Sequence, residues 1–200
     1  VPSLEICIDK PVAIIGESGL GKSTFVETLI GLRKPISGDC NFIDNNNLNF
    51  KTLQSISYIP QNCQFSGSSI FEMLSFGNPF LKNSISDKNT KLKIINILKI
   101  ACVWDDFVFT FDDLYKDIGE GAAALSGGQK QRITLARALL QDKKILIFDE
   151  STNGLDNDLE KKIISNIVNI KSKIIIFITH NIEIGNIFHN VINMRDYGIN

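Results

Sequence analysis

A nine-residue segment, Gly16–Thr24, constrains the fold of this 200-residue chain more than any other part of the sequence. It reads Gly-Glu-Ser-Gly-Leu-Gly-Lys-Ser-Thr, which fits the pattern GxxxxGK followed by Ser or Thr, and it lies between the apolar run Val12–Ile15 and the helically spaced segment Lys22–Gly31. Glycines at these positions let backbone N–H groups surround a phosphate, and the start of a helix adds a favourable dipole. The alternative is a plain glycine-rich turn between a strand and a helix. The complete motif in this context favours a phosphate-binding loop in an α/β protein.

Each part of this loop has a predicted role toward a Mg-nucleoside triphosphate. Lys22 is expected to neutralise β- and γ-phosphate oxygens, and the Ser23 hydroxyl to coordinate Mg²⁺. The candidate nucleotide-binding residues are Gly16, Glu17, Ser18, Gly19, Leu20, Gly21, Lys22, Ser23 and Thr24.

Two adjacent carboxylates follow a second apolar run, Ile145–Phe148. Ligands of open α/β sheets bind at the carboxyl ends of the strands, where Asp149 and Glu150 are expected to lie. Asp149 would hold Mg²⁺ and Glu150 would orient and activate the attacking water. Paired acids also occur in solvated turns after a strand, but the phosphate loop in the same chain favours the catalytic interpretation.

The third motif is Leu125–Arg132, Leu-Ser-Gly-Gly-Gln-Lys-Gln-Arg. Ser126 is suited to cap a helix, and the free N–H groups of that helix start form an anion site. LSGGQ at the start of a helix resembles the signature of the ATP-binding-cassette (ABC) ATPases, and the three motifs follow the order of that family. The resemblance covers nearly the whole chain.

The resemblance implies that ATP and Mg²⁺ are bound and that a second ABC ATPase domain is a partner. In this family the signature completes the nucleotide pocket of the partner, so two ATP molecules lie between two facing domains. The residues expected to serve the partner's nucleotide are Ser126, Gly128 and Gln129.

Three single residues gain a role only through the resemblance. Gln61, in Tyr-Ile-Pro-Gln, resembles the Q-loop glutamine that reaches Mg²⁺ and senses the nucleotide, although a lone glutamine is more often a surface residue. His180 resembles the switch histidine that contacts the γ-phosphate. Asp156 resembles the D-loop aspartate that crosses the dimer interface, or it caps the following helix. The D-loop has Asn153-Gly154 where Ser-Ala is usual.

The expected fold is a P-loop NTPase core of the α/β class with a mostly parallel sheet. Its predicted strands are Val12–Ile15, Ile56–Ile59, Ile145–Phe148 and Ile174–Ile178, rich in β-branched residues as buried parallel strands are. No strong strand is expected between Ser68 and Leu125, where Ser69–Phe76 and Lys88–Ala101 have helical patterns. We therefore expect a single ABC ATPase domain over residues 1–200, with a RecA-like core (1–66 and 126–200) and an inserted helical lobe (about 67–125).

The N-terminal β-subdomain of the family is expected to be incomplete here. The chain begins with Val1 rather than Met, which indicates a piece of a longer protein, and only Leu4–Ile8 and Val12–Ile15 precede the phosphate loop. No adenine-stacking residue is therefore assigned.

Short matches favour an exporter among ABC proteins. Ile118–Gly121 resembles the X-loop that touches the membrane domain of exporters, and Phe65–Glu72 resembles the exporter pattern after the Q-loop. The expected function is an ATP-hydrolysing motor domain at the cytoplasmic face of a membrane, paired with a transmembrane domain that moves a peptide, lipid or drug-like molecule.

Three other functions remain alternatives: an importer subunit, a non-transport ABC ATPase of DNA repair or chromosome structure, and a regulatory module without turnover. The segment between Lys22 and Ser126 is filled by the helical lobe and leaves no room for the coiled-coil arm of the repair proteins. Glu150 and His180 together argue against a module without turnover.

Composition limits the possible partners. The net charge of −1 gives no electrostatic reason to expect nucleic acid. The apolar runs are far shorter than the roughly 20 residues of a membrane span. Four scattered cysteines without a CxxC pair indicate reduced thiols in a cytosolic protein.

Overall fold

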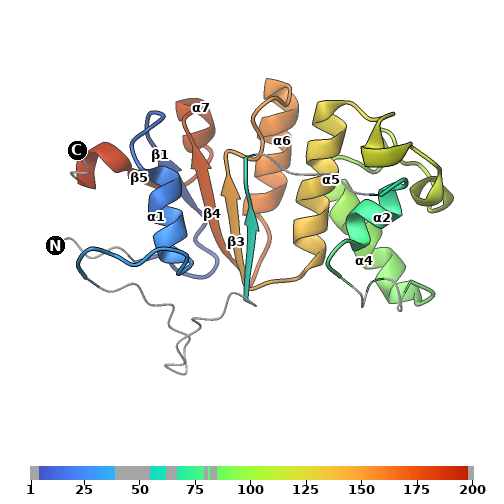
Figure 1. Cartoon of the computed structure of the whole chain (residues 1–200), viewed down its shortest axis with the longest axis horizontal. Helices are drawn as coiled ribbons and strands as arrows, with labels where there is room; N and C mark the ends of the chain where they lie inside the picture. Colours follow the sequence, from blue (N-terminus) through green and yellow to red (C-terminus); the bar gives the residue numbers. More distant parts are fainter. Residues whose placement is uncertain (1–4, 39–54, 62–66, 79–80, 82–84, 198–200) are drawn as a thin grey trace. The chain divides into compact units, whose positions relative to one another are not determined.

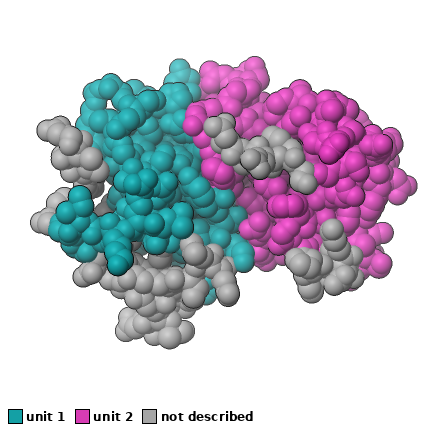
Figure 2. Space-filling view, viewed as in Figure 1, with its two compact units in different colours: residues 1–58, 143–150, 170–200 teal, residues 59–142, 151–169 magenta. Residues whose placement is uncertain are grey.

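The computed structural model describes residues 5–38, 55–61, 67–78, 81 and 85–197, which form two compact units (Figures 1 and 2). Unit 1 comprises residues 1–58, 143–150 and 170–200, and unit 2 comprises residues 59–142 and 151–169. The boundaries expected for the helical lobe, about 67–125, are not tested by this division and stay a prediction.

Unit 1 is built on a five-stranded sheet in the order β2-β3-β4-β1-β5 (Figure 1). The strands are β1 (Val12–Ile15), β2 (Ile56–Ile59, whose last residue belongs to unit 2), β3 (Ile145–Asp149), β4 (Ile174–Thr179) and β5 (Asn190–Asn193). β1 pairs in parallel with β4 and with β5, and β3 pairs in parallel with β4. The α/β class and the parallel sheet are as predicted, whereas residues 5–8 form no strand.

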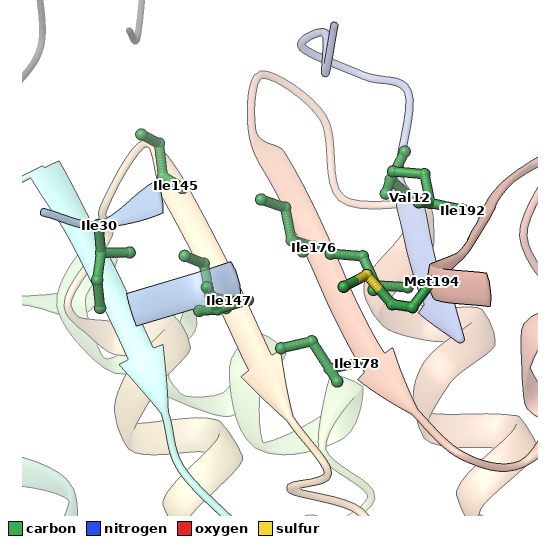
Figure 3. Close-up of a cluster of buried hydrophobic side chains, with 10 residues drawn as sticks. Val12, Ile30, Ile145, Ile147, Ile176, Ile178, Ile192 and Met194 are labelled. Atoms are coloured by element: carbon green, nitrogen blue, oxygen red, sulfur yellow. The ribbon is translucent and has the colours of Figure 1, made fainter. Parts of the chain in front are cut away.

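One face of this sheet packs against helix α1 (Lys22–Leu29) and the residue that ends it, Ile30. Alternate residues of a strand point to the same face, so β3 and β4 each send two isoleucines into one cluster, shown in Figure 3. Burying each such side chain stabilises the fold by roughly 1.5–3 kcal/mol. The buried members are Val12, Ile14, Val26, Ile30, Ile145, Ile147, Ile176, Ile178, Ile192 and Met194.

Phe148 on β3 and its neighbour Phe177 on β4 form an aromatic stack. The rings of Phe148 and Phe177 lie 5.1 Å apart between centroids, and Phe188 lies 5.6 Å from Phe177. The short helix α7 (Ile182–Gly185) approaches β1 so closely that a Cβ on Gly185 would lie 3.0 Å from Ile15 Cγ2. Glycine therefore fits this position, where the chain returns after β4, without displacing Ile15. The 3₁₀ helix η4 (Met194–Tyr197) follows β5.

Unit 2 is helical in its described part. Its elements are α2 (Ile70–Ser75), α4 (Lys88–Ile100), η2 (Asp112–Tyr115), η3 (Glu120–Ala122), α5 (Gly127–Leu140) and α6 (Asn157–Val168). Helices α2 and α4 both pack against α5. Side-chain oxygens of Ser69 and Asp87 cap the N-termini of α2 and α4. Both helices therefore begin close to where the sequence predicts them. Across the described residues of 67–125, the β structure is limited to an isolated bridge between Trp104 and Val108.

Arg132 fixes the loop that follows α4 onto α5. Its buried guanidinium donates hydrogen bonds to the Cys102 carbonyl (2.6 Å) and to Asp106 Oδ2 (2.7 Å), and it lies over the Phe107 ring at 4.9 Å. Burial at this junction also raises the pKa of the Cys102 thiol. The last residue of the signature motif thus has a structural role inside unit 2.

Candidate nucleotide site

Three strands of unit 1 end at the same edge of the sheet. Ile15 at the end of β1 is opposite Thr179 of β4, and Asp149 at the end of β3 is opposite Ile178. The phosphate loop, the Asp149-Glu150 pair and His180 follow these strand ends directly, so three segments far apart in sequence emerge side by side. This edge is where open α/β sheets bind ligands.

The phosphate loop depends on glycine at two backbone positions. Gly19 has φ +88° and Gly21 has φ +77°, a left-handed conformation that strains other residues. Gly21 is also the residue that precedes α1, and the first turn of α1 carries no acidic side chain. The positive end of the helix dipole is therefore not neutralised by the helix itself, which favours an anion at this loop.

Lys22 bends back over the loop. Its Nζ donates to the carbonyl oxygens of Gly16 (2.8 Å) and Glu17 (2.9 Å) and lies 3.5 Å from Glu150 Oε1. The side chain is only 5% exposed, so its charge is held by these oxygens rather than by water. A cation is therefore already in place at this loop.

Glu150 carries backbone strain. Its φ is +47°, which is costly for a residue with a side chain, and its N–H donates to the Ile178 carbonyl at 3.0 Å. The carboxylate is 14% exposed, and His180 Nδ1 lies 3.4 Å from the same Oε1 that faces Lys22. Strain of about 1–3 kcal/mol that is maintained by surrounding contacts is common at functional sites.

Tyr58 is a site residue that sequence reasoning missed. Its hydroxyl donates to Asp149 Oδ2 at 2.8 Å, and Asp149 is 5% exposed. Tyr58 shares a face of β2 with Ile56, which packs on the hydrophobic cluster, and β2 is the neighbour of β3. Strand alternation was the available signal, but it required knowing which strands are adjacent.

The donor set fits Mg²⁺. Asp149 offers a carboxylate and Ser23 an exposed hydroxyl, both hard oxygen ligands. The described residues contain no group of three or more His, Cys, Asp or Glu side chains able to hold a metal ion. Mg²⁺ bound together with substrate phosphates needs only one or two protein ligands and water.

A second residue that the sequence did not reveal lies at the outer side of the loop. Arg195, in η4, forms an exposed ion pair with the carboxylate of Glu17. The pair neutralises a negative charge inside the loop that would otherwise oppose the binding of phosphates.

The signature residues belong to unit 2 and serve first as helix caps. Gln129 N–H donates to Ser126 Oγ (3.2 Å), and Ser126 N–H donates to Gln129 Oε1 (2.9 Å), a reciprocal capping box at an exposed helix start. Asp156 likewise caps α6 by accepting from the N–H groups of Asp158 and Leu159. The expected roles of these residues at a partner's nucleotide stay predictions.

Gln61 also belongs to unit 2, where it is exposed and lines a cavity of about 270 Å³ together with residues of α5 and of the segment after Glu150. Its expected role at Mg²⁺ is not tested by the structure.

Comparison with known proteins assigns the family. Residues 2–153 match the ABC transporter family, so this chain belongs to that family and is an ABC ATPase domain. The resemblance inferred from the motifs is confirmed.

The relatives include transport proteins. The chain is 38% identical over 204 residues to the lactococcin-G-processing and transport ATP-binding protein LagD of Lactococcus lactis subsp. lactis, covering 98% of this chain and 27% of that protein. It is 37% identical over 162 residues to the sophorolipid transporter of Starmerella bombicola, covering 79% of this chain and 12% of that protein. The chain therefore spans about a quarter or less of the length of these relatives.

The fold is similar to that of a solved exporter. A bacterial Atm1-family ABC exporter with ATP bound superposes with a TM-score of 0.71 at 25% sequence identity, covering 96% of this chain and 33% of the exporter chain. Among the described residues, no helix is both long and apolar enough to cross a membrane.

Proposed function

We propose that this chain binds Mg-ATP at the strand ends of unit 1, pairs with a second ABC ATPase domain and hydrolyses ATP to drive an exporter. The observation that carries the proposal is the convergence of Lys22, Asp149, Glu150 and His180 at one edge of the sheet. A buried lysine, a buried carboxylate and an acid beside an imidazole supply binding, metal coordination and water activation in one place.

The lysine and the loop would bind the triphosphate. Lys22 would exchange its carbonyl partners for β- and γ-phosphate oxygens, while the N–H groups at the start of α1 donate to the same anion. Mg²⁺ held by Asp149 and Ser23 would neutralise further phosphate charge when bound. Tyr58 keeps the Asp149 carboxylate in one orientation during this exchange.

Glu150 would orient the attacking water and accept its proton. Its strained backbone and its N–H bond to the Ile178 carbonyl fix the carboxylate at the strand end. Exposed His180 would contact the γ-phosphate from the end of β4, at a distance from Glu150 that a hydrogen bond could bridge with little movement.

The exposed start of α5 would complete the pocket of the partner domain. Ser126 and Gly127 are exposed, and the helix start offers N–H groups and a positive dipole to a γ-phosphate. Glu120, exposed in η3, would face the transmembrane domain at the cytoplasmic face of the membrane. The names of the relatives favour a peptide or a lipid as the transported molecule.

Mixing two inactive variants tests this arrangement. Ser126→Arg places bulk and charge at the signature, and Glu150→Gln removes the base, so neither homodimer should hydrolyse ATP. The heterodimer combines both defects in one composite pocket and leaves the other intact, and it should regain ATPase activity. A mixture as inactive as its components, or a Ser126→Arg chain that hydrolyses at the parental rate, would contradict a shared pocket.

A further inference from the structure

The segment Ser151–Asp156, here called the partner-facing loop, is held at its base by both neighbouring helices of unit 2. Gln131, on α5, donates its side-chain amide to the Ser151 carbonyl at 2.5 Å. Thr152 donates its hydroxyl to Glu160 Oε1 on α6 at 2.6 Å, and both of these residues are buried. The base of the loop is therefore fixed on α5 and α6, within unit 2.

A side-chain hydrogen bond from Gln131 joins the loop to α5. Ser151 is buried, yet its hydroxyl oxygen has no hydrogen-bond partner in the part of the chain that the structure describes. The carbonyl is thus the atom of Ser151 through which α5 holds the loop. Gly128, also on α5, contributes close packing, since a Cβ there would lie 3.3 Å from Leu155 Cδ2.

The tip of the loop is different from its base. Gly154 is exposed and has φ +91°, and a Cβ there would meet no atom within 4 Å. Leu155 N–H closes the turn by donating to the Thr152 carbonyl at 3.2 Å. The shape of this exposed tip follows from how the buried base is fixed.

We propose that Gln131 is a positioning residue that sets the partner-facing loop for association with the second ATPase domain. This inference rests on the proposed function, because it assigns the loop to the dimer interface. Helix α5 carries both Ser126 at its exposed start and Gln131 one turn further, so one helix orders two surfaces that the same partner contacts. Without the amide donor, the buried carbonyl loses its partner and the loop relaxes.

The test uses the Glu150→Gln chain, in which bound ATP is not consumed. Gln131→Glu keeps the shape but removes the donor, and Gln131→Lys keeps a donor. Asn166→Asp is a matched control, because Asn166 on α6 also donates an amide to a backbone carbonyl, that of Ile100, at 3.1 Å. ATP binding, melting temperature and sedimentation with Mg-ATP are measured for each chain.

We expect Gln131→Glu to weaken ATP-dependent dimerisation by about tenfold or more while the monomer binds ATP as the parent does. Asn166→Asp should lower the melting temperature to a similar extent and leave dimerisation unchanged, and Gln131→Lys should dimerise nearly as the parent does. Equal dimerisation of the Gln131→Glu and parent chains would overturn the inference, as would an equal loss in Asn166→Asp. A parent chain that stays monomeric with Mg-ATP would instead overturn the proposed sandwich itself.

Discussion

The two units hold their candidate functional residues by different kinds of contact. In unit 1 the contacts join segments far apart in the sequence, as between Tyr58 and Asp149 or between Lys22 and Glu150. In unit 2 the signature and D-loop residues bond within a single helical turn, Ser126 with Gln129 and Asp156 with Leu159. The sheet brings the residues of unit 1 together, whereas the residues of unit 2 come together at the starts of helices.

This difference shows what one chain can reveal about a site that we propose to be shared between two chains. The residues of unit 1 already face one another, so their chemistry is visible in a single copy. The helix caps of unit 2 are complete without a ligand, and only their exposure leaves room for a second role. We therefore expect changes at the strand ends of unit 1 to affect ATP binding or chemistry directly, and changes at the starts of α5 and α6 in unit 2 to act through the partner.

The largest expected effect separates chemistry from binding inside unit 1. Glu150→Gln should lower ATP hydrolysis by about 10²–10⁴-fold, because the variant keeps the side-chain shape but loses the base. Affinity for ATP should remain, since the loop and the Lys22 side chain that donates to its carbonyls are both retained. Phosphate release and binding of a fluorescent ATP analogue measure the two quantities. Parental hydrolysis in the variant would assign the base elsewhere.

Removing the cation should instead abolish tight binding. Lys22→Ala loses a charge-assisted contact that contributes about 1.5–3 kcal/mol, which corresponds to a roughly 10- to 150-fold weaker affinity. Equilibrium titration with labelled ATP measures it. Lys93→Ala is the control in unit 2, because Lys93 pairs with Asp142 on the surface. Similar affinities for both variants would show that Lys22 makes no specific contribution to ATP binding.

A smaller effect tests the contact between β2 and β3. Tyr58→Phe removes only the hydroxyl that binds Asp149, so we expect about a tenfold higher Mg²⁺ concentration for half-maximal hydrolysis. Tyr115→Phe in unit 2 should leave the Mg²⁺ dependence as it is. A Tyr58→Phe chain with unchanged Mg²⁺ dependence would show that Asp149 is oriented without this bond.

The smallest effect concerns acid stability in unit 2. A hydrogen bond from Lys116, with others from the N–H groups of Phe109 and Thr110, holds the pKa of Asp113 well below its usual 3.8. A lowered pKa stabilises the folded state above the usual pKa, and this contribution is lost as the pH falls below about 4. Asp113→Asn should therefore lose less stability than the parent when melting is followed from pH 6 to about pH 3. A parallel decline of both chains would exclude this contribution.

The parts of the structure that were predictable are those with a local cause. The runs Ile145–Phe148 and Ile174–Ile178 predict buried parallel strands, and β3 and β4 each extend one residue beyond them. β5 was missed because Asn190–Asn193 has only two apolar residues between two asparagines, too little for a pattern of alternation. Its pairing with β1 supplies what the sequence signal lacks.

The contacts of the two site residues that sequence reasoning missed are set by the order of the strands and by the paths of the loops. Nothing near Tyr58 in the sequence indicates Asp149, and nothing near Arg195 indicates Glu17, because both contacts require knowing which strand ends are neighbours. The glycine of the unusual pair Asn153-Gly154 is explained locally, since φ +91° at Gly154 suits glycine and strains alanine.

The left-handed backbone at Glu150 has a consequence for protein engineering. Glycine adopts φ +47° without penalty and asparagine with little, so the fold alone would prefer either residue there. Directed evolution for heat resistance alone should therefore enrich Glu150→Gly and Glu150→Asn. These variants should have a higher melting temperature and should no longer hydrolyse ATP. If Glu150 is the proposed base, a glutamate at this position costs folding stability and supplies catalysis in return.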